Sequence, residues 1–260
     1  PIDEQAWHEG HNLAHHPYTN VAGRDPDMHF GPVRLTERTP HRWFHRLQVP
    51  FTLFGSMPTF AFSMNLHFTG VLDVGRGGEG EPDAKPPFRQ AAWRALRKFV
   101  PYYGKEFALF PLLAGPMFAK VMLGNALSEL MRDLYTAASI HCGHIGEDVE
   151  AYAPGTRSGG RGGWYAMQVR SAHNFQVPYL LSVLCGGLDY QIEHHLFPKL
   201  PPERLRQIAP EVRAICEAHG VPYRTGPWLE VLGDALGELW RLSFPIEADA
   251  ARHVATGVAT

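Results

Sequence analysis

The sequence has very little cysteine. Its 260 residues contain three, Cys142, Cys185 and Cys216, and these lie far apart. An odd number of scattered cysteines argues against a disulfide framework, and the lack of any CxxC pair argues against the common cysteine-based metal and redox motifs. We therefore expect a reducing, cytoplasm-facing environment.

The sequence also lacks an excess of charge of either sign. Its 24 basic and 26 acidic residues give a net charge of −2, so no global field favours a nucleic-acid partner. It has no haem motif and no cysteine-based redox pair. Any redox chemistry carried out by this chain therefore needs a separate electron donor.

Histidine, in contrast, is abundant and clustered. The chain has 15 histidines, and the segment HNLAHH, residues 11–16, has the spacing HxxxHH. On an α-helix His11 and His15 lie one turn apart on one face, and His16 is turned about 100° further. Two of these imidazoles can then meet one metal ion while the third reaches a neighbouring one.

A second cluster, QIEHH, has the spacing QxxHH, which brings Gln191, His194 and His195 onto a shared helical face. His144 lies between the clusters, with His141 three residues earlier. Each cluster alone is weak evidence, because an HH pair is more often a surface or capping feature. A structural zinc site needs only four ligands and usually includes cysteine, so this many imidazoles indicates two metal ions.

Apolar stretches long enough to cross a bilayer are few. Residues 51–72 carry no charge and could span or lie in the interface, and residues 107–145 are roughly long enough for two crossings of a ~30 Å hydrocarbon layer. Residues 88–100 read as a basic amphipathic helix at the cytoplasmic membrane surface. Histidine clusters that share one site need an even number of crossings between them. We therefore expect 107–145 to be a transmembrane helical hairpin; the alternative is one span in each apolar region.

The end of the chain reads as soluble helices. Residues 203–219 form an amphipathic pattern interrupted by Pro210, and residues 228–240 repeat it with leucines on one stripe. We expect residues 196–245 to be cytosolic helices that fold back under the histidine clusters.

Several of these motifs together resemble those of a known family. HNLAHHPYTN followed by GRDPD, the GH at 143–144, and GGLDYQIEHHLFPKLP are similar to the acyl-lipid and acyl-CoA desaturases, particularly the branch whose third histidine box begins with Gln. The likeness runs from about residue 7 to 227. It implies an all-α fold, in which a membrane-embedded helical bundle carries a cytosolic helical cap holding a histidine-rich di-iron site.

Transferred residue by residue, the resemblance implies six metal ligands: His11, His15, His16, His144, His194 and His195. Gln191 stands where some relatives have a ligand histidine. Further candidates are His141, Asp25 and Asp27, the last two because a carboxylate can orient an imidazole through its other ring nitrogen.

One feature of the family is missing. Its first box, HxxxH or HxxxxH, should lie a few tens of residues before His11, whereas the chain opens at Pro1. We therefore expect residues 1–260 to be one desaturase domain lacking its N-terminal part, with at least two iron ligands and further spans upstream. His8 lies too close to His11 to be that box, and we expect it to be a bystander.

The resemblance implies an enzyme that uses O2 and two iron ions to introduce a double bond into a fatty acyl chain on a lipid or CoA. Electrons would come from a ferredoxin or a small haem cytochrome with its reductase. We expect an integral membrane protein in contact with membrane lipid, with its active site on the cytoplasmic side. The alternatives are a di-iron lipid hydroxylase or ketolase, which differs only in substrate positioning, and a non-catalytic remnant lacking the first box. A soluble zinc protein fits least.

Overall fold

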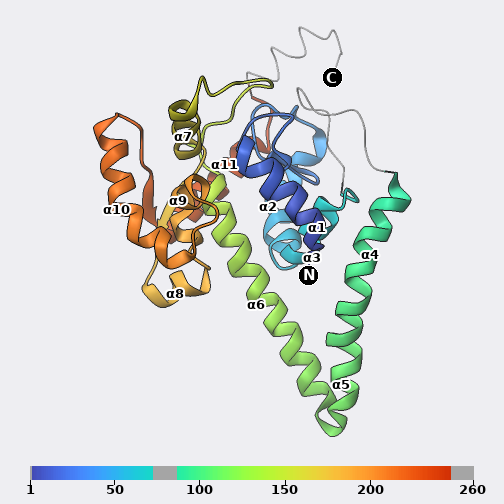
Figure 1. Ribbon diagram of the computed structural model, residues 1–260. Coiled ribbons are helices and arrows are strands. Elements are labelled where there is room, and N and C mark those ends of the chain that lie inside the picture. Colours follow the sequence, from blue (N-terminus) through green and yellow to red (C-terminus); the bar gives the residue numbers. More distant parts are fainter. Residues whose placement is uncertain (1, 73–86, 247–260) are drawn as a thin grey trace.

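The computed structural model describes residues 2–72 and 87–246. They form a helical body from which one long helical hairpin projects (Figure 1). The strands in this part of the chain are two or three residues long and pair in two small sheets, β1 with β2 antiparallel and β3 with β4 parallel. The predicted all-α class is therefore confirmed.

The elements follow one another in three groups. Up to residue 72 they are α1 (Glu4–Trp7), η1 (His8–His15), η2 (His16–Tyr18), η3 (Pro26–Met28), β1 (His29–Phe30), β2 (Val33–Arg34), η4 (Trp43–Leu47), α2 (Gln48–Phe51), η5 (Thr52–Ser56) and α3 (Phe60–Phe68). The hairpin comprises α4 (Phe88–Gly104), η6 (Lys105–Leu109), α5 (Phe110–Leu113), η7 (Gly115–Met117) and α6 (Phe118–His144). The remaining elements are α7 (Arg161–Arg170), β3 (Asn174–Gln176), α8 (Tyr179–Leu184), η8 (Leu188–Tyr190), α9 (Gln191–Leu196), α10 (Pro202–Ala218), β4 (Thr225–Pro227) and α11 (Trp228–Leu242).

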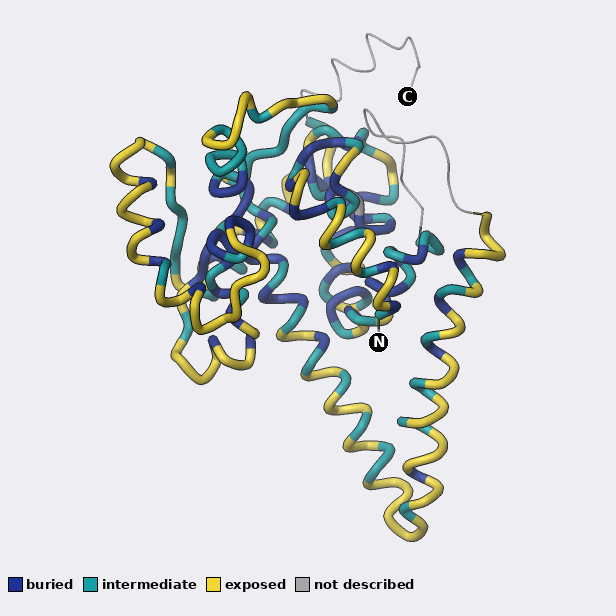
Figure 2. Tube along the Cα trace, viewed as in Figure 1, coloured by how far each residue is buried: buried dark blue, intermediate teal, exposed yellow. Residues whose placement is uncertain are grey.

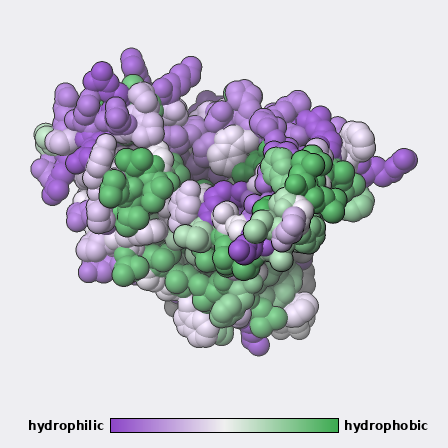
Figure 3. Space-filling view, turned by 90° about the horizontal axis from the view of Figure 1, so that it is seen from below, coloured by the Kyte–Doolittle hydropathy of each residue, from purple (hydrophilic) through white to green (hydrophobic). Residues whose placement is uncertain are grey.

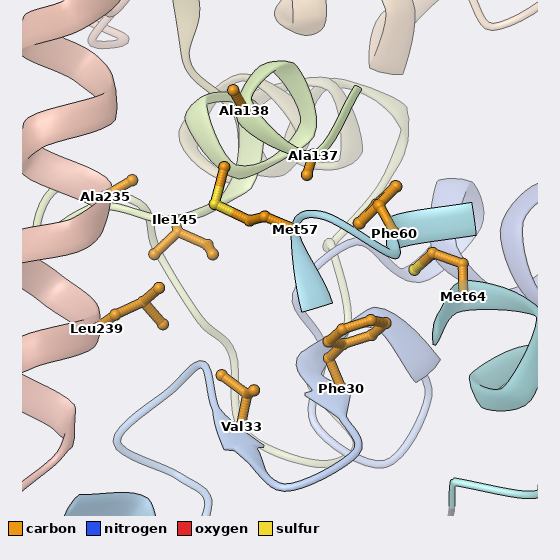
Figure 4. Packing of buried hydrophobic residues seen from close by; sticks show 10 residues of the cluster. All are labelled: Phe30, Val33, Met57, Phe60, Met64, Ala137, Ala138, Ile145, Ala235 and Leu239. Carbon is orange, nitrogen blue, oxygen red and sulfur yellow. The ribbon is translucent and has the colours of Figure 1, made fainter. Parts of the chain in front are cut away.

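The main hydrophobic core joins four parts of the chain. It packs β1 and β2, α3, the end of α6, and α11 around the buried residues that Figure 4 labels: Phe30, Val33, Met57, Phe60, Met64, Ala137, Ala138, Ile145, Ala235 and Leu239. The alanines of α6 and α11 allow close approach of these helices. Because Ala137 and Ile145 belong to this core, the C-terminal end of α6 is held firmly against the N-terminal segment.

The uncharged segment 51–72 belongs to the body. Its helix stops at Ser56, before Pro58, and a new helix starts at Phe60. Phe60 and Met64 are buried in the main core. The segment therefore packs against other protein elements along α3.

A second core holds α9 in place. Ile192 and Leu196 of α9 pack with Val169 of α7 and Val212 of α10. The prediction that Pro210 breaks the helix here was wrong, because α10 runs unbroken from Pro202 to Ala218. Pro210 is exposed, so the backbone carbonyl that loses its helical partner can be hydrated.

The hairpin differs in its limits from the one predicted for 107–145. Its first arm begins at Phe88 and continues through η6 to Leu113, so the basic helix is the start of this arm. The chain turns at Gly115, whose φ of +54° suits glycine, and Pro116 follows. Both arms expose many residues (Figure 2). Within the described ranges, no helix combines the length and the apolar character needed to cross a membrane.

The basic side chains of α4 have protein partners. Arg94 lies 2.8 Å from Glu9, and Arg97 donates to Asp3 at 2.8 and 3.0 Å. Asp3 is buried, whereas Glu9 is exposed, so the Arg97 pair is the better shielded from solvent. These ion pairs attach the first arm of the hairpin to the segment that carries the first histidine cluster.

Candidate metal centre

The first histidine cluster lies on a π-helical turn. In η1 the backbone N–H of His16 donates to the carbonyl of His11, five residues earlier. His11 and His16 are therefore one π-helical turn apart, with ring centroids 4.6 Å from each other. The predicted neighbourhood of His11 and His15 is also present, because their rings stack with centroids 5.1 Å apart and both belong to a potential metal-binding group with Asp27. π-Helical turns occur frequently at functional sites.

Three separate segments bring the six predicted ligands together. His11, His15 and His16 come from η1 and η2, His144 is the last residue of α6, and His194 and His195 lie in α9. The main core holds the end of α6 against the N-terminal segment, and the second core fixes α9 against α7 and α10.

The six histidines form two groups with no shared member. Ligand nitrogens of His11, His16 and His194 lie within 4.8 Å of one another, and so do those of His15, His144 and His195. Asp27 joins a further group with His11 and His15. Each histidine triad thus combines the first cluster with α9, and one of them adds α6.

The ligand atoms in each triad are close enough together to share a cation. His15 Nε2 and His16 Nδ1 are buried without a hydrogen-bond partner. The Nε2 atoms of His144 and His195 lie 3.3 Å apart. Unpaired buried polar atoms cost about 1–3 kcal/mol each, and a shared metal ion would satisfy several of them. Neutral imidazoles suit iron and other transition metals, so the donor set fits such an ion.

Burial keeps most of these imidazoles neutral. Desolvation, followed by the neighbouring His11, lowers the pKa of His16 to about 2 and that of His194 to about 4. The neutral imidazole is the metal-binding form. His15 differs: burial acts to lower its pKa, but the carboxylates of Asp25 and Asp27 raise it to about 9.

Asp25 contacts the far side of the His15 ring. Both of its oxygens lie 3.0 Å from His15 Nδ1, and they also accept the backbone N–H groups of Asn20 and Asp27. Asp27 Oδ2 is more distant, 3.4 Å from His15 Nδ1 and 3.8 Å from His11 Nδ1. The structure therefore places Asp25 where it can orient a ligating imidazole, as predicted.

Gln191 lies inside the second triad. Its amide nitrogen is 2.7 Å from His144 Nε2 and 3.2 Å from His195 Nε2, and its carbonyl oxygen is buried without a partner. Gly143 makes room for it, since a Cβ at that position would lie 2.8 Å from Gln191 Cγ. The GH pair at 143–144 therefore supplies a candidate ligand and the space beside it.

Two other histidines do not join the triads. His141 points its Nδ1 at the carbonyl of Ala137 in its own helix, 2.6 Å away. His8 is exposed and contacts Asn12. Neither belongs to a potential metal-binding group among the described residues.

Several side chains around the cluster were not predicted. Thr19 and Gln168 contact His195, and Glu193 accepts hydrogen bonds from Asn174 and Tyr223. Thr19 and Gln168 carry no spacing signal of their own, although Glu193 lies within the QIEHH segment and so was within reach of the sequence.

A polar cleft of about 560 Å³ reaches the second triad from outside. His15 and His144 form part of its wall, together with charged side chains that include Arg38, Glu147 and Arg241. Small polar molecules thus have a route towards these histidines.

Comparison with known proteins agrees with this site. The family model for fatty acid desaturases matches residues 2–227, and the chain belongs to this family. It is 31% identical over 248 residues to an NADPH-dependent stearoyl-CoA 9-desaturase of Mycobacterium tuberculosis, covering 92% of this chain and 56% of that protein.

Two further relatives are more distant. Identity is 27% over 247 residues to an sn-1 linoleoyl-lipid 6-desaturase of Synechocystis, covering 88% of this chain and 67% of that protein. It is 27% over 228 residues to an acyl-lipid (8-3)-desaturase of Mortierella alpina, covering 84% and 49%. The chain thus spans about half to two thirds of the length of these relatives. No solved structure matches it with comparable significance.

Proposed function

We propose that this chain provides iron ligands for a fatty acid desaturase, which uses O2 to introduce a double bond into an acyl chain. The observation that carries the proposal is the division of six histidines into two triads without a shared member. A single structural metal site would not require this second set of imidazoles.

In this proposal His11, His16 and His194 hold one iron ion, and His15, His144 and His195 hold the other. Bound iron would supply the oxidising power, from O2 and two electrons, that removes hydrogen from an unactivated methylene; no side-chain base is strong enough to do so. The protein holds most of the imidazoles neutral, excludes water from them by burial, and orients His15 through Asp25.

A fatty acyl chain is the substrate class we propose, because the relatives are named for stearoyl-CoA and for linoleoyl-lipid desaturation. The cleft beside His15 and His144 offers O2 a route to the second triad, and its charged wall suits the docking of an external electron donor such as a ferredoxin or small haem cytochrome.

We also propose that the protein sits at a membrane, with the histidine cluster on the cytoplasmic side. The bend of the hairpin exposes Leu112 and Leu113 at 68% and 74%, and α8 exposes Leu180 at 76%. From the side of this bend, apolar side chains gather over large parts of the surface (Figure 3). Large exposed apolar patches mark contacts with lipid or protein. The three cysteines are free, which is compatible with a reducing compartment.

The test is expression of the complete gene in a host that lacks its own desaturase, followed by lipid profiling and iron analysis of the purified protein. We expect a new unsaturated fatty acid and about two iron ions per chain, since each triad would hold one. His194→Ala and His195→Ala should abolish the product and reduce the iron content.

His8→Ala is the matched control, because His8 lies on η1 but is exposed and outside both triads. It should retain iron and product. Full activity in the His194→Ala variant, or a single zinc ion in place of iron, would contradict the proposal. A hydroxylated or keto product would instead favour the related oxidation.

A further inference from the structure

His195 is held from two sides. It is fully buried, and its Nε2 faces the centre of the second triad, 3.3 Å from His144 Nε2. Its Nδ1 faces the opposite way, 3.0 Å from the hydroxyl oxygen of Thr19 and 3.2 Å from Oε1 of Gln168. Thr19 and Gln168 are themselves 1% and 2% exposed, so water does not compete for these contacts.

The hydrogen bonds of this group determine which nitrogen of His195 carries the proton. The Thr19 hydroxyl has one hydrogen, and both the carbonyl of His15 and Oε1 of Gln168 lie 2.9 Å away as acceptors. Whichever of them accepts it, both oxygens still present lone pairs towards His195 Nδ1. Because Oε1 of Gln168 can only accept, we assign the proton to Nδ1; the lone pair of Nε2 then faces the triad and the amide of Gln191.

The two side chains come from distant parts of the chain. Thr19 follows the first histidine cluster, and Gln168 lies in α7, which packs against α9 through the second core. Through this contact the backbone carbonyl of His15 and the ring of His195 belong to one hydrogen-bonded group. The orientation of one imidazole thus depends on three segments that the fold brings together.

We propose that Gln168 and Thr19 are positioning residues for metal binding, which fix the tautomer and ring plane of His195 so that Nε2 meets the ion. This inference rests on the proposed function, because it needs a metal in the second triad. It assigns a role on His195 that corresponds to that of Asp25 on His15, with an uncharged oxygen in place of a carboxylate.

The test compares metal affinity in the complete protein, purified without metal and titrated with Fe²⁺ under anaerobic conditions and with Co²⁺. Gln168→Leu keeps the size of the side chain and removes the acceptor. Loss of an outer hydrogen bond to a metal ligand typically weakens metal binding about 10- to 100-fold. We expect a loss of that size for one of two bound ions, with altered visible absorption of bound Co²⁺.

Two further variants address the same contact independently. Gln168→Glu retains an oxygen acceptor and should preserve binding, and Thr19→Val should weaken it as Gln168→Leu does. Gln48→Leu is the matched control, since Gln48 is 1% exposed and joins Arg34 to Leu239 away from the histidines. It should lower the unfolding temperature without changing metal affinity.

Each outcome is decisive. Wild-type affinity and Co²⁺ spectra in Gln168→Leu and Thr19→Val would overturn the positioning role and leave the proposed function intact. An equal loss of affinity in Gln48→Leu would also overturn the positioning role, because the effect would then come from general destabilisation. A wild-type protein that binds neither ion would overturn the proposed function itself, and this inference with it.

Discussion

Replacing a single hydrogen by a methyl group should have opposite effects at two glycines of α6. At Gly124 an added Cβ meets nothing within 4 Å, and the residue is exposed. Alanine is favoured over glycine inside a helix by about 1 kcal/mol, so Gly124→Ala should stabilise the protein by up to that amount. At Gly143 the same Cβ would lie 2.8 Å from Cγ of Gln191 and 3.0 Å from its Cδ.

The clash at Gly143 cannot be relieved at the end of a flexible chain, because the Cβ of Gln191 lies only 3.4 Å away as well. The whole side chain must move, or α6 and α9 must separate. Overpacking of this kind costs about 1–3 kcal/mol, which outweighs the gain in helix propensity. Gly143→Ala should therefore destabilise the protein by up to about 2 kcal/mol, and it should displace the Gln191 amide from His144 and His195.

Equilibrium unfolding in detergent, followed by tryptophan fluorescence, measures the free energies, and iron content reports on the site. Combining Gly143→Ala with Gln191→Ala supplies the internal control, since removing the Gln191 side chain removes the clash. In that background Gly143→Ala should be neutral or stabilising. Equal shifts of the same sign for Gly124→Ala and Gly143→Ala in the wild-type background would refute the packing argument.

Three other changes should have measurable effects. Glu193→Ala should lower the free energy of unfolding by roughly 2–4 kcal/mol, more than Glu193→Gln does, because it leaves the Tyr223 hydroxyl and one N–H of the buried Asn174 amide without an acceptor; urea titration measures both. Asp25→Asn should bring the pKa of His15 below about 9 in the metal-free protein, as followed by NMR titration, since it removes an adjacent negative charge. The metal-free protein should lose stability as pH falls from about 6.5 to 4, because His194 titrates at about 4 when folded and near 6.5 when unfolded; the slope of unfolding free energy against pH should decrease in His194→Ala.

The sequence was most informative where chemistry is dense along the chain. The HxxxHH and QxxHH spacings identified five of the six histidines that the fold brings together, because each motif places several imidazoles within one or two helical turns. The sixth, His144, lies in neither motif and was identified through the family resemblance of its GH pair. The two C-terminal helices were also predictable, since their apolar residues recur at helical spacing. In both cases the information is local.

The features that the sequence could not predict depend on tertiary packing or on a small change in backbone hydrogen bonding. HxxxHH is compatible with either an α-helix or a π-turn, and only packing decides which nitrogens converge. The basic face of α4 predicted contact with a membrane surface. Its ion-pair partners Asp3 and Glu9 could not be foreseen, because they lie more than 80 residues earlier in the chain. Gln168 is an ordinary helical residue until α7 is packed against α9.

Both triads draw on adjacent pairs of histidines, and they differ in how deeply the protein buries them. In each HH pair the two adjacent side chains point in different directions around the helix, so His15 and His16 belong to different triads, and so do His194 and His195. The separation of the triads is thus set by helix geometry rather than by loops. The second triad takes its third member, His144, from α6, whose end is fixed by the main core, and it places both His15 and His195 out of contact with solvent. In the first triad the side chain of His11 is 15% exposed. The second triad is therefore the more deeply buried of the two, and the cleft beside His15 and His144 is its route to solvent.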